Sequence, residues 1–135
     1  MTANIWKALP HFIKNNSGVA ALIVDRVYPM RLPETTTLPA IAFQDISTVA
    51  TQAHKERSIL PRPRFQFTIY GGTVESIDLV SKALKTALDG YQGNMGTGSY
   101  ITEVEACLYK NEFSNDDPET GIYLRYQDYL IMYKE

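Results

Sequence analysis

The residues that could take part in catalysis are few and scattered. Glu103 and Glu105 alternate along a predicted strand, so both carboxylates would lie on one face, a spacing compatible with general acid–base chemistry. Acids at alternate positions of an exposed strand are, however, more often solvated than catalytic. Cys107 shares that face, and no basic residue flanks it to lower its thiol pKa and make it a nucleophile. We therefore expect no catalytic centre here.

Metal and phosphate binding have little support in the sequence. The single cysteine and the two histidines, His11 and His54, cannot form a multi-cysteine site and leave mainly carboxylates as metal ligands. The glycines between residues 90 and 98 follow a predicted helix and precede a predicted strand, which is the reverse of a phosphate-binding loop. We predict that the chain is not an enzyme and holds no cofactor or metal.

The composition is that of an ordinary folded domain. The chain has 135 residues, of which 44% are hydrophobic and 21% charged, values that exclude a mainly disordered chain. One hydrophobic core is the usual outcome at this length, so residues 1–135 are predicted to form a single domain. The longest apolar run, Val19 to Val24, is far shorter than the ~18 residues of a membrane span, so we expect no membrane contact.

Hydrophobic periodicity predicts the order helix, strand, strand, helix, strand, strand. The first helix covers residues 4–14, and the second begins after Thr73 and ends before Gly90. The strands are predicted over residues 40–48, 64–70 and 100–109 and in the final segment from residue 122, with loops over 49–63, 93–98 and 111–121. This order predicts a two-layer α+β domain, in which helices cover one face of a mostly antiparallel four-stranded sheet.

The final predicted strand is apolar on both sides, so one side should stay free of helices and be buried only when subunits assemble. Its first side carries Ile122, Leu124, Tyr126, Leu130 and Met132, and its second carries Tyr123, Tyr129, Ile131 and Tyr133. We predict an oligomer interface on the second side, formed by Tyr70, Tyr109, Tyr123, Tyr129, Ile131 and Tyr133. In the alternative, the first helix covers part of that face.

Two predicted loops carry opposite charge. The basic one contains Lys55, Arg57, Arg62 and Arg64, and the acidic one contains Glu112, Asp116, Asp117 and Glu119. In a ring, where each subunit presents different surfaces to its two neighbours, these loops would meet across the subunit boundary. The alternative is that both loops are simply solvated, since exposed ion pairs contribute only ~0–1 kcal/mol.

The order of several short segments resembles a known family. These segments are Arg26-Val-Tyr-Pro29, Leu38-Pro-Ala-Ile41 leading a strand, Arg64-Phe-Gln-Phe-Thr-Ile-Tyr70 before a helix that ends at Leu88-Asp-Gly90, and a late tyrosine-rich hairpin. Over nearly the whole chain, this order resembles the tail completion proteins of long-tailed bacteriophages. Those proteins are also called tail terminator or tail-to-head joining proteins.

The resemblance implies a structural virion protein. Family members form a hexameric ring on the last ring of the tail tube, stop tube polymerisation and offer a docking surface for the head stopper protein. The implied partners are copies of this chain, the tail tube protein and the head stopper, while DNA passes through the lumen without specific binding. The implied location is the head-proximal end of the tail in the virion, after assembly in the host cytoplasm. The alternative function is a small-molecule-binding regulatory α+β module, whose pocket would lie between the apolar sheet face and a helix.

Overall fold

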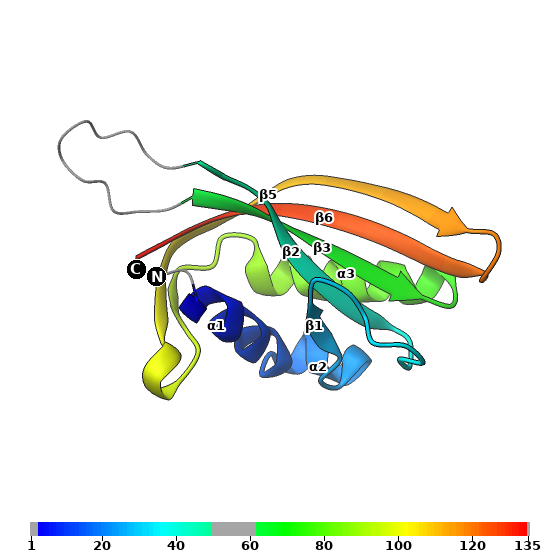
Figure 1. The fold of residues 1–135 in the computed structure, drawn as a ribbon, viewed down its shortest axis with the longest axis horizontal. Coiled ribbons are helices and arrows are strands. Elements are labelled where there is room, and N and C mark those ends of the chain that lie inside the picture. Colours follow the sequence, from blue (N-terminus) through cyan, green and yellow to red (C-terminus); the bar gives the residue numbers. More distant parts are fainter. Residues whose placement is uncertain (1–2, 50–61, 135) are drawn as a thin grey trace.

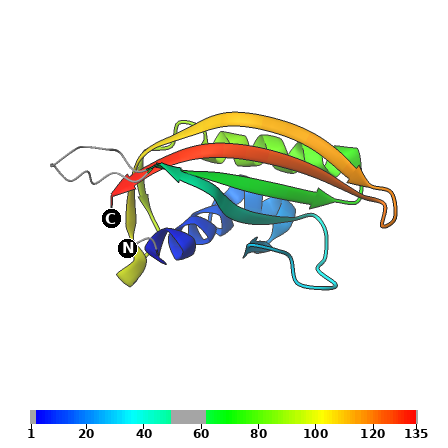
Figure 2. The same ribbon diagram turned by 45° about the horizontal axis from the view of Figure 1, so that its top comes forward.

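The protein consists of a curved sheet that arches over a layer of helices (Figure 1). The computed structural model describes residues 3–49 and 62–134. All three helices of this described part lie on the same side of the sheet, and Figure 2 shows the other side free of them. The predicted arrangement, with helices on one face of a sheet, is therefore confirmed for the described residues.

Two of the helices each begin with a short polar side chain that caps the helix. Helix α2 (Ser17–Ile23) has Asn16 as its N-cap, whose side chain accepts a hydrogen bond from the Val19 amide at 3.1 Å. Helix α3 (Val74–Leu88) begins at Thr73, as predicted, and the Thr73 hydroxyl accepts from the Ser76 amide at 3.0 Å. Helix α1 (Ala3–Lys14) continues through Pro10.

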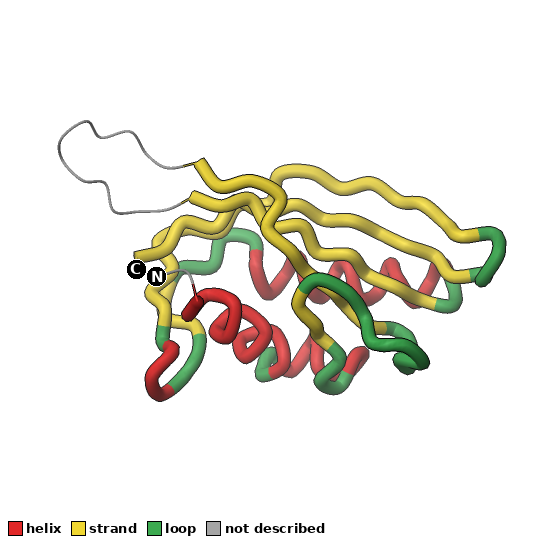
Figure 3. The backbone as a smooth tube through the Cα atoms, viewed as in Figure 1, coloured by secondary structure: helices red, strands yellow, loops and turns green. Residues whose placement is uncertain are grey.

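The sheet has six strands in the spatial order β1-β2-β3-β6-β5-β4, drawn in yellow in Figure 3. Strands β1 and β2 are parallel, and every other neighbouring pair is antiparallel. The strand bounds are β1 Val27–Pro29, β2 Ala40–Val49, β3 Arg62–Gly71, β4 Gly93–Met95, β5 Thr102–Asp117 and β6 Ile122–Lys134, and a short 3-10 helix, η1, covers Gly98–Tyr100.

The prediction of a four-stranded sheet is wrong, because β1 and β4 also belong to the sheet. Each has only three residues, which is too short for an alternating pattern to show. Both are held by pairing with distant residues: β1 pairs with Ile41–Phe43 of β2, and β4 with residues 102–104 of β5. The sheet is therefore mixed and wider than predicted.

The predicted acidic loop over residues 111–121 is mostly strand. Strand β5 continues to Asp117, and its pairing with β6 extends to Asp117 opposite Ile122. Residues 110–116 are all exposed and, apart from Phe113, polar, so their composition is that of a loop although they form a strand. The pairing with β6, rather than local composition, therefore determines how far β5 extends.

The core lies between the helices and the inner face of the sheet. Phe43, Phe65 and Phe67 from β2 and β3 are at most 1% exposed. The ring of Trp6 on α1 stacks on Phe43 with the centroids 5.2 Å apart. Residues from all three helices join the same hydrophobic cluster, among them Leu9, Ile23 and Leu84. Burial of such side chains contributes about 1.5–3 kcal/mol each, which fixes the helix layer against this face of the sheet.

Candidate assembly surface

The helices cover the side of β6 that was predicted to stay free. In the strand register Tyr129 lies opposite Phe65 of the core, and Tyr129, Ile131 and Tyr133 are at most 2% exposed. The expectation that these three residues wait for a partner at a free surface is therefore wrong. Both sides of β6 are apolar, so the alternation of its residues could not indicate which side packs on the helices.

Two further tyrosines of the predicted interface also lie on the helix side. Tyr109 and Tyr123 are partly buried and pack against the core. The Tyr109 hydroxyl donates to Glu112 Oε1 at 2.9 Å, and Lys85 Nζ lies 4.2 Å from the centre of its ring. Burial, together with the bond to Glu112, raises the pKa of the Tyr109 hydroxyl above its ordinary value. Tyr109 is thus engaged within its own chain.

The opposite side of the sheet carries a different apolar patch. We call this patch the helix-free face. It consists of Tyr70 on β3, Leu108 and Phe113 on β5, and Leu124, Tyr126, Leu130 and Met132 on β6. The register places Leu124 opposite Tyr70, Tyr126 opposite Phe113, and Leu130 opposite Leu108. Of the interface tyrosines predicted from the sequence, Tyr70 alone lies here.

Some side chains of the helix-free face are exposed to solvent. Phe113 and Leu108 are 48% and 39% exposed. The rings of Phe113 and Tyr126 stack with their centroids 4.6 Å apart, and Tyr126 is also one cause, after burial, of the raised pKa of Tyr70. Exposed apolar side chains grouped in this way, on both sides of the polar Asp128, are typical of an interaction site.

The predicted basic loop is described only at its end. Lys55 and Arg57 lie outside the described residues, and Arg62 and Arg64 belong to β3. On the same side of the sheet as the helix-free face, Arg64 Nη2 lies 3.4 Å from Asp128 Oδ2, and Gln66 Nε2 donates to the other Asp128 oxygen at 3.2 Å. The positive charge of Arg64 is therefore balanced within the chain.

The acidic residues predicted in the other loop separate into two groups. Glu112 points toward the helices, where its Oε1 accepts from Gln127 Nε2 at 2.9 Å. Asp117 Oδ1 accepts a hydrogen bond from the amide of Glu119 at 3.1 Å and so stabilises the turn between β5 and β6. The carboxylates of Asp116 and Glu119 are exposed and form no ion pair with another described residue.

A polar cluster missed by the sequence analysis joins α3 to the β5–β6 hairpin. Arg125 Nη1 donates to Asp78 Oδ1 at 3.0 Å, and hydrogen bonds from Arg125 and Lys82 lower the pKa of Asp78. Gln127 donates to the carbonyl of Ser81 at 3.2 Å and accepts from the Tyr129 hydroxyl at 3.0 Å. Since these groups satisfy one another, the cluster positions the hairpin on α3.

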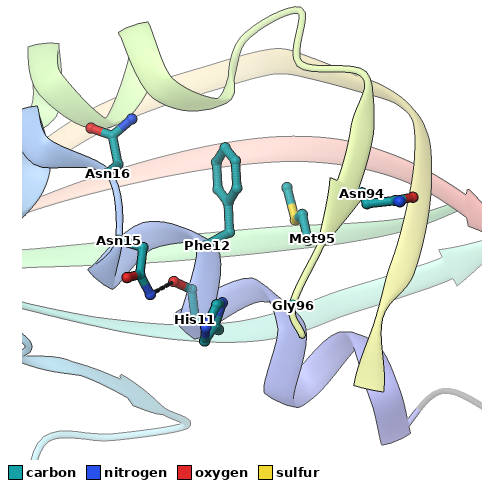
Figure 4. A pocket seen from close by; sticks show the side chains of 7 residues that line it. All are labelled: His11, Phe12, Asn15, Asn16, Asn94, Met95 and Gly96. Carbon is teal, nitrogen blue, oxygen red and sulfur yellow. Dashed lines mark hydrogen bonds between the residues drawn. The ribbon is translucent and has the colours of Figure 1, made fainter. Parts of the chain in front are cut away.

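The described surface offers shallow hollows rather than an enclosed site. One hollow of about 250 Å³ lies between the end of α1 and β4, lined by His11, Phe12, Asn15, Asn16, Asn94, Met95 and Gly96 (Figure 4). In it, the Asn15 side chain donates to the His11 carbonyl at 2.8 Å. No group of three or more His, Cys, Asp or Glu side chains that could hold a metal occurs among the described residues.

Cys107 is a core residue. It is fully buried on the inner face of β5, and burial, with a smaller effect of Asp89, raises the pKa of its thiol to about 12. No helix among the described residues is long and apolar enough to span a membrane.

Comparison with known proteins reveals similarity in structure but not in sequence. No protein-family model and no curated protein sequence matches the chain. A chain in the structure of the virion of a native gene transfer agent (GTA) particle matches with a TM-score of 0.73 and 10% sequence identity. The match covers 95% of this chain and 92% of that one. The two chains therefore share a fold over nearly their whole lengths.

Proposed function

We propose that this chain is a structural, non-enzymatic protein of a phage-like virion. In this proposal, copies of the chain form a ring, hexameric in the family that the sequence resembles, at the head-proximal end of the tail tube. The ring terminates tube polymerisation and joins the tail to the head stopper. The observation that carries the proposal is the structural match, over nearly the full length, to a chain in a gene transfer agent virion. The role at the end of the tail tube rests on the order of sequence segments, which resembles that of the tail completion proteins.

The surface of the subunit is compatible with a ring. A head-to-tail ring needs two different contact surfaces on each subunit. The helix-free face offers an apolar surface that copies of the chain, or the tube and stopper proteins, would cover. The net charge of −2 gives a ring no strong overall attraction for DNA, which suits a lumen through which DNA must pass.

The two oppositely charged segments lie at opposite ends of the sheet. Arg64 pairs with Leu130, near the end of β6, whereas the acidic turn follows Asp117, which pairs with Ile122 at its start. They are thus kept apart within one subunit, so any contact between them requires neighbouring subunits. We include in the proposal that the acidic turn of one subunit faces basic residues of the next.

The alternative function, a small-molecule-binding regulatory module, has no specific support. Its pocket was expected between the sheet and a helix, but in the described residues Phe43, Phe65, Phe67 and Tyr129 fill that space. The ligand pockets of such modules are concave and largely pre-formed.

The deciding experiment compares particles made with and without this protein by electron microscopy. We expect particles without it to show overlong or unfinished tail tubes beside filled, unjoined heads, and re-addition of the purified chain to join them. Tails of normal length that are already joined to heads would contradict the proposal.

A further inference from the structure

A groove along α1 combines cationic and aromatic side chains. It has a volume of about 310 Å³, and its lining residues are Trp6, Lys7, Pro10, His11, Lys14, Val27, Pro29 and Tyr100. The rings of His11 and Tyr100 meet edge to face with their centroids 5.8 Å apart, which joins α1 to η1. The groove is therefore formed by α1, β1 and η1 together.

Among the described residues, no ion pair balances the positive charge of this groove. Lys7 and Lys14 are exposed, lie seven residues apart on α1, and so project from the same side of the helix. Neither lysine forms an ion pair with any residue in the described part of the chain. The aromatic rings of Trp6 and Tyr100 are partly exposed beside them. An occupant with carboxylates and some apolar surface fits this chemistry.

The chain carries such a segment at the turn between β5 and β6. Asp116 and Glu119 are exposed without an ion partner in the described residues, and Pro118 lies between them. The turn is held by hydrogen bonds from the amides of Glu119 and Gly121 to Asp117, at 3.1 and 2.8 Å. A turn that is already ordered loses little conformational entropy on binding.

The turn cannot reach the groove of its own subunit. Tyr100, which lines the groove, lies two residues before β5, and the turn follows the last residue of β5. Strand β5 has 16 residues, which corresponds to roughly 50 Å at ~3.3 Å per residue. Figure 1 shows the hairpin turn at one end of the molecule and the start of α1 toward the other. Contact between the two surfaces requires two copies of the chain.

We propose that the groove along α1 binds the acidic β5–β6 turn of a second copy. The inference rests on the proposed ring and names the contact that joins its subunits. Lys7 and Lys14 pair with Asp116 and Glu119 of the neighbour, and Pro118 of the neighbour packs on the aromatic rings. Because donor and acceptor surfaces differ, each copy binds one neighbour on each side, as a closed ring requires.

Charge reversal on the two surfaces tests this contact. The variant Lys7→Glu/Lys14→Glu and the variant Asp116→Lys/Glu119→Lys should each weaken assembly at least ~10-fold, measured by sedimentation with and without tail tube protein. The chain that carries all four substitutions should recover assembly to within ~3-fold of wild type, because every contact then has its charges exchanged. A matched control is Arg31→Glu/Lys110→Glu, which changes two exposed cations that lie outside the groove and form no ion pair among the described residues, and it should assemble normally.

The outcomes separate this contact from the proposed function. Normal assembly of Lys7→Glu/Lys14→Glu would overturn the groove contact. The same holds if the chain with all four substitutions is folded, as judged by an unchanged circular dichroism spectrum, but does not recover assembly. Both results would leave the ring proposal standing. Loss of assembly in Arg62→Glu but not in the groove variant would assign the acidic turn to the basic segment instead. A wild-type chain that stays monomeric even with tube protein would overturn both proposals.

Discussion

At the scale of single residues, the groups with the most strongly shifted pKa values in the described part are buried or paired. Cys107, the only thiol, lies in the core with a pKa raised to about 12 by burial. The most perturbed acid, Asp78, is held in its charged form by Arg125 and Lys82 rather than poised to exchange a proton. Neither group is arranged to attack or protonate a substrate.

Cys107 should react slowly in the folded chain. At pH 8 a thiol with a pKa near 12 is almost entirely protonated, and the thiolate is the reactive form. We expect Ellman's reagent to modify native Cys107 at least ~100-fold more slowly than in guanidinium, where an ordinary pKa of about 8.5 applies. Comparable rates in the two conditions would show that the thiol is accessible.

The ion pair of Asp78 predicts a pH dependence of stability. Its pKa is lowered in the folded state, so the pairing stabilises the fold fully above the unfolded pKa of about 3.9 and is lost as the pH falls through the folded pKa. Asp78→Asn should therefore lower the melting temperature by a constant amount between about pH 5 and pH 7. The difference should shrink below about pH 4. If the difference in melting temperature between the two chains persists at low pH, the loss of stability has another cause than the ion pair.

At the scale of elements, β6 has a different role on each of its two sides. Its inner side carries Tyr129, which packs on Phe67 with the ring centroids 5.5 Å apart and donates to Gln127. Its outer side carries Tyr126 and Leu130 of the helix-free face. Substitutions on the two sides should consequently have different effects, on folding for the inner side and on assembly for the outer side.

Tyr129→Ser should unfold or strongly destabilise the chain. It removes a fully buried ring and leaves a cavity, for which about 3–5 kcal/mol is typical of aromatic truncations in cores. Tyr129→Phe keeps the ring and loses only the bond to Gln127, at a cost of about 1 kcal/mol. Urea denaturation measures both. Equal, small losses for the two variants would show that the ring is not part of the core.

At the scale of the whole molecule, the helices cover one side of the sheet and leave the other side uncovered. The helix layer, the hairpin turn and the helix-free face lie on different sides of the molecule (Figures 1 and 2), and they carry cationic, acidic and apolar side chains respectively. A subunit built in this way can contact different neighbours with different surfaces, as the proposed ring between a tail tube and a head would require.

Polar substitution on the helix-free face should remove assembly and spare the fold. Leu108→Ser/Phe113→Ser changes two side chains that are 39% and 48% exposed, so the melting temperature should fall by only a few degrees while ring formation, seen by electron microscopy, is lost. The control Leu79→Ser removes a side chain that is 49% exposed on α3 and should form rings. Rings formed equally by both variants would contradict a role for this face.

The sequence by itself determined the elements whose signals are local. Alternation over residues 64–70 indicates β3, and Thr73 with the apolar stripe after it indicates α3, because side-chain period and capping depend on near neighbours. Only the tertiary structure decided which apolar side of β6 the helices cover, that β1 and β4 join the sheet, and that β5 extends to Asp117. These features arise from pairing and packing between residues far apart in the chain, which no local period records.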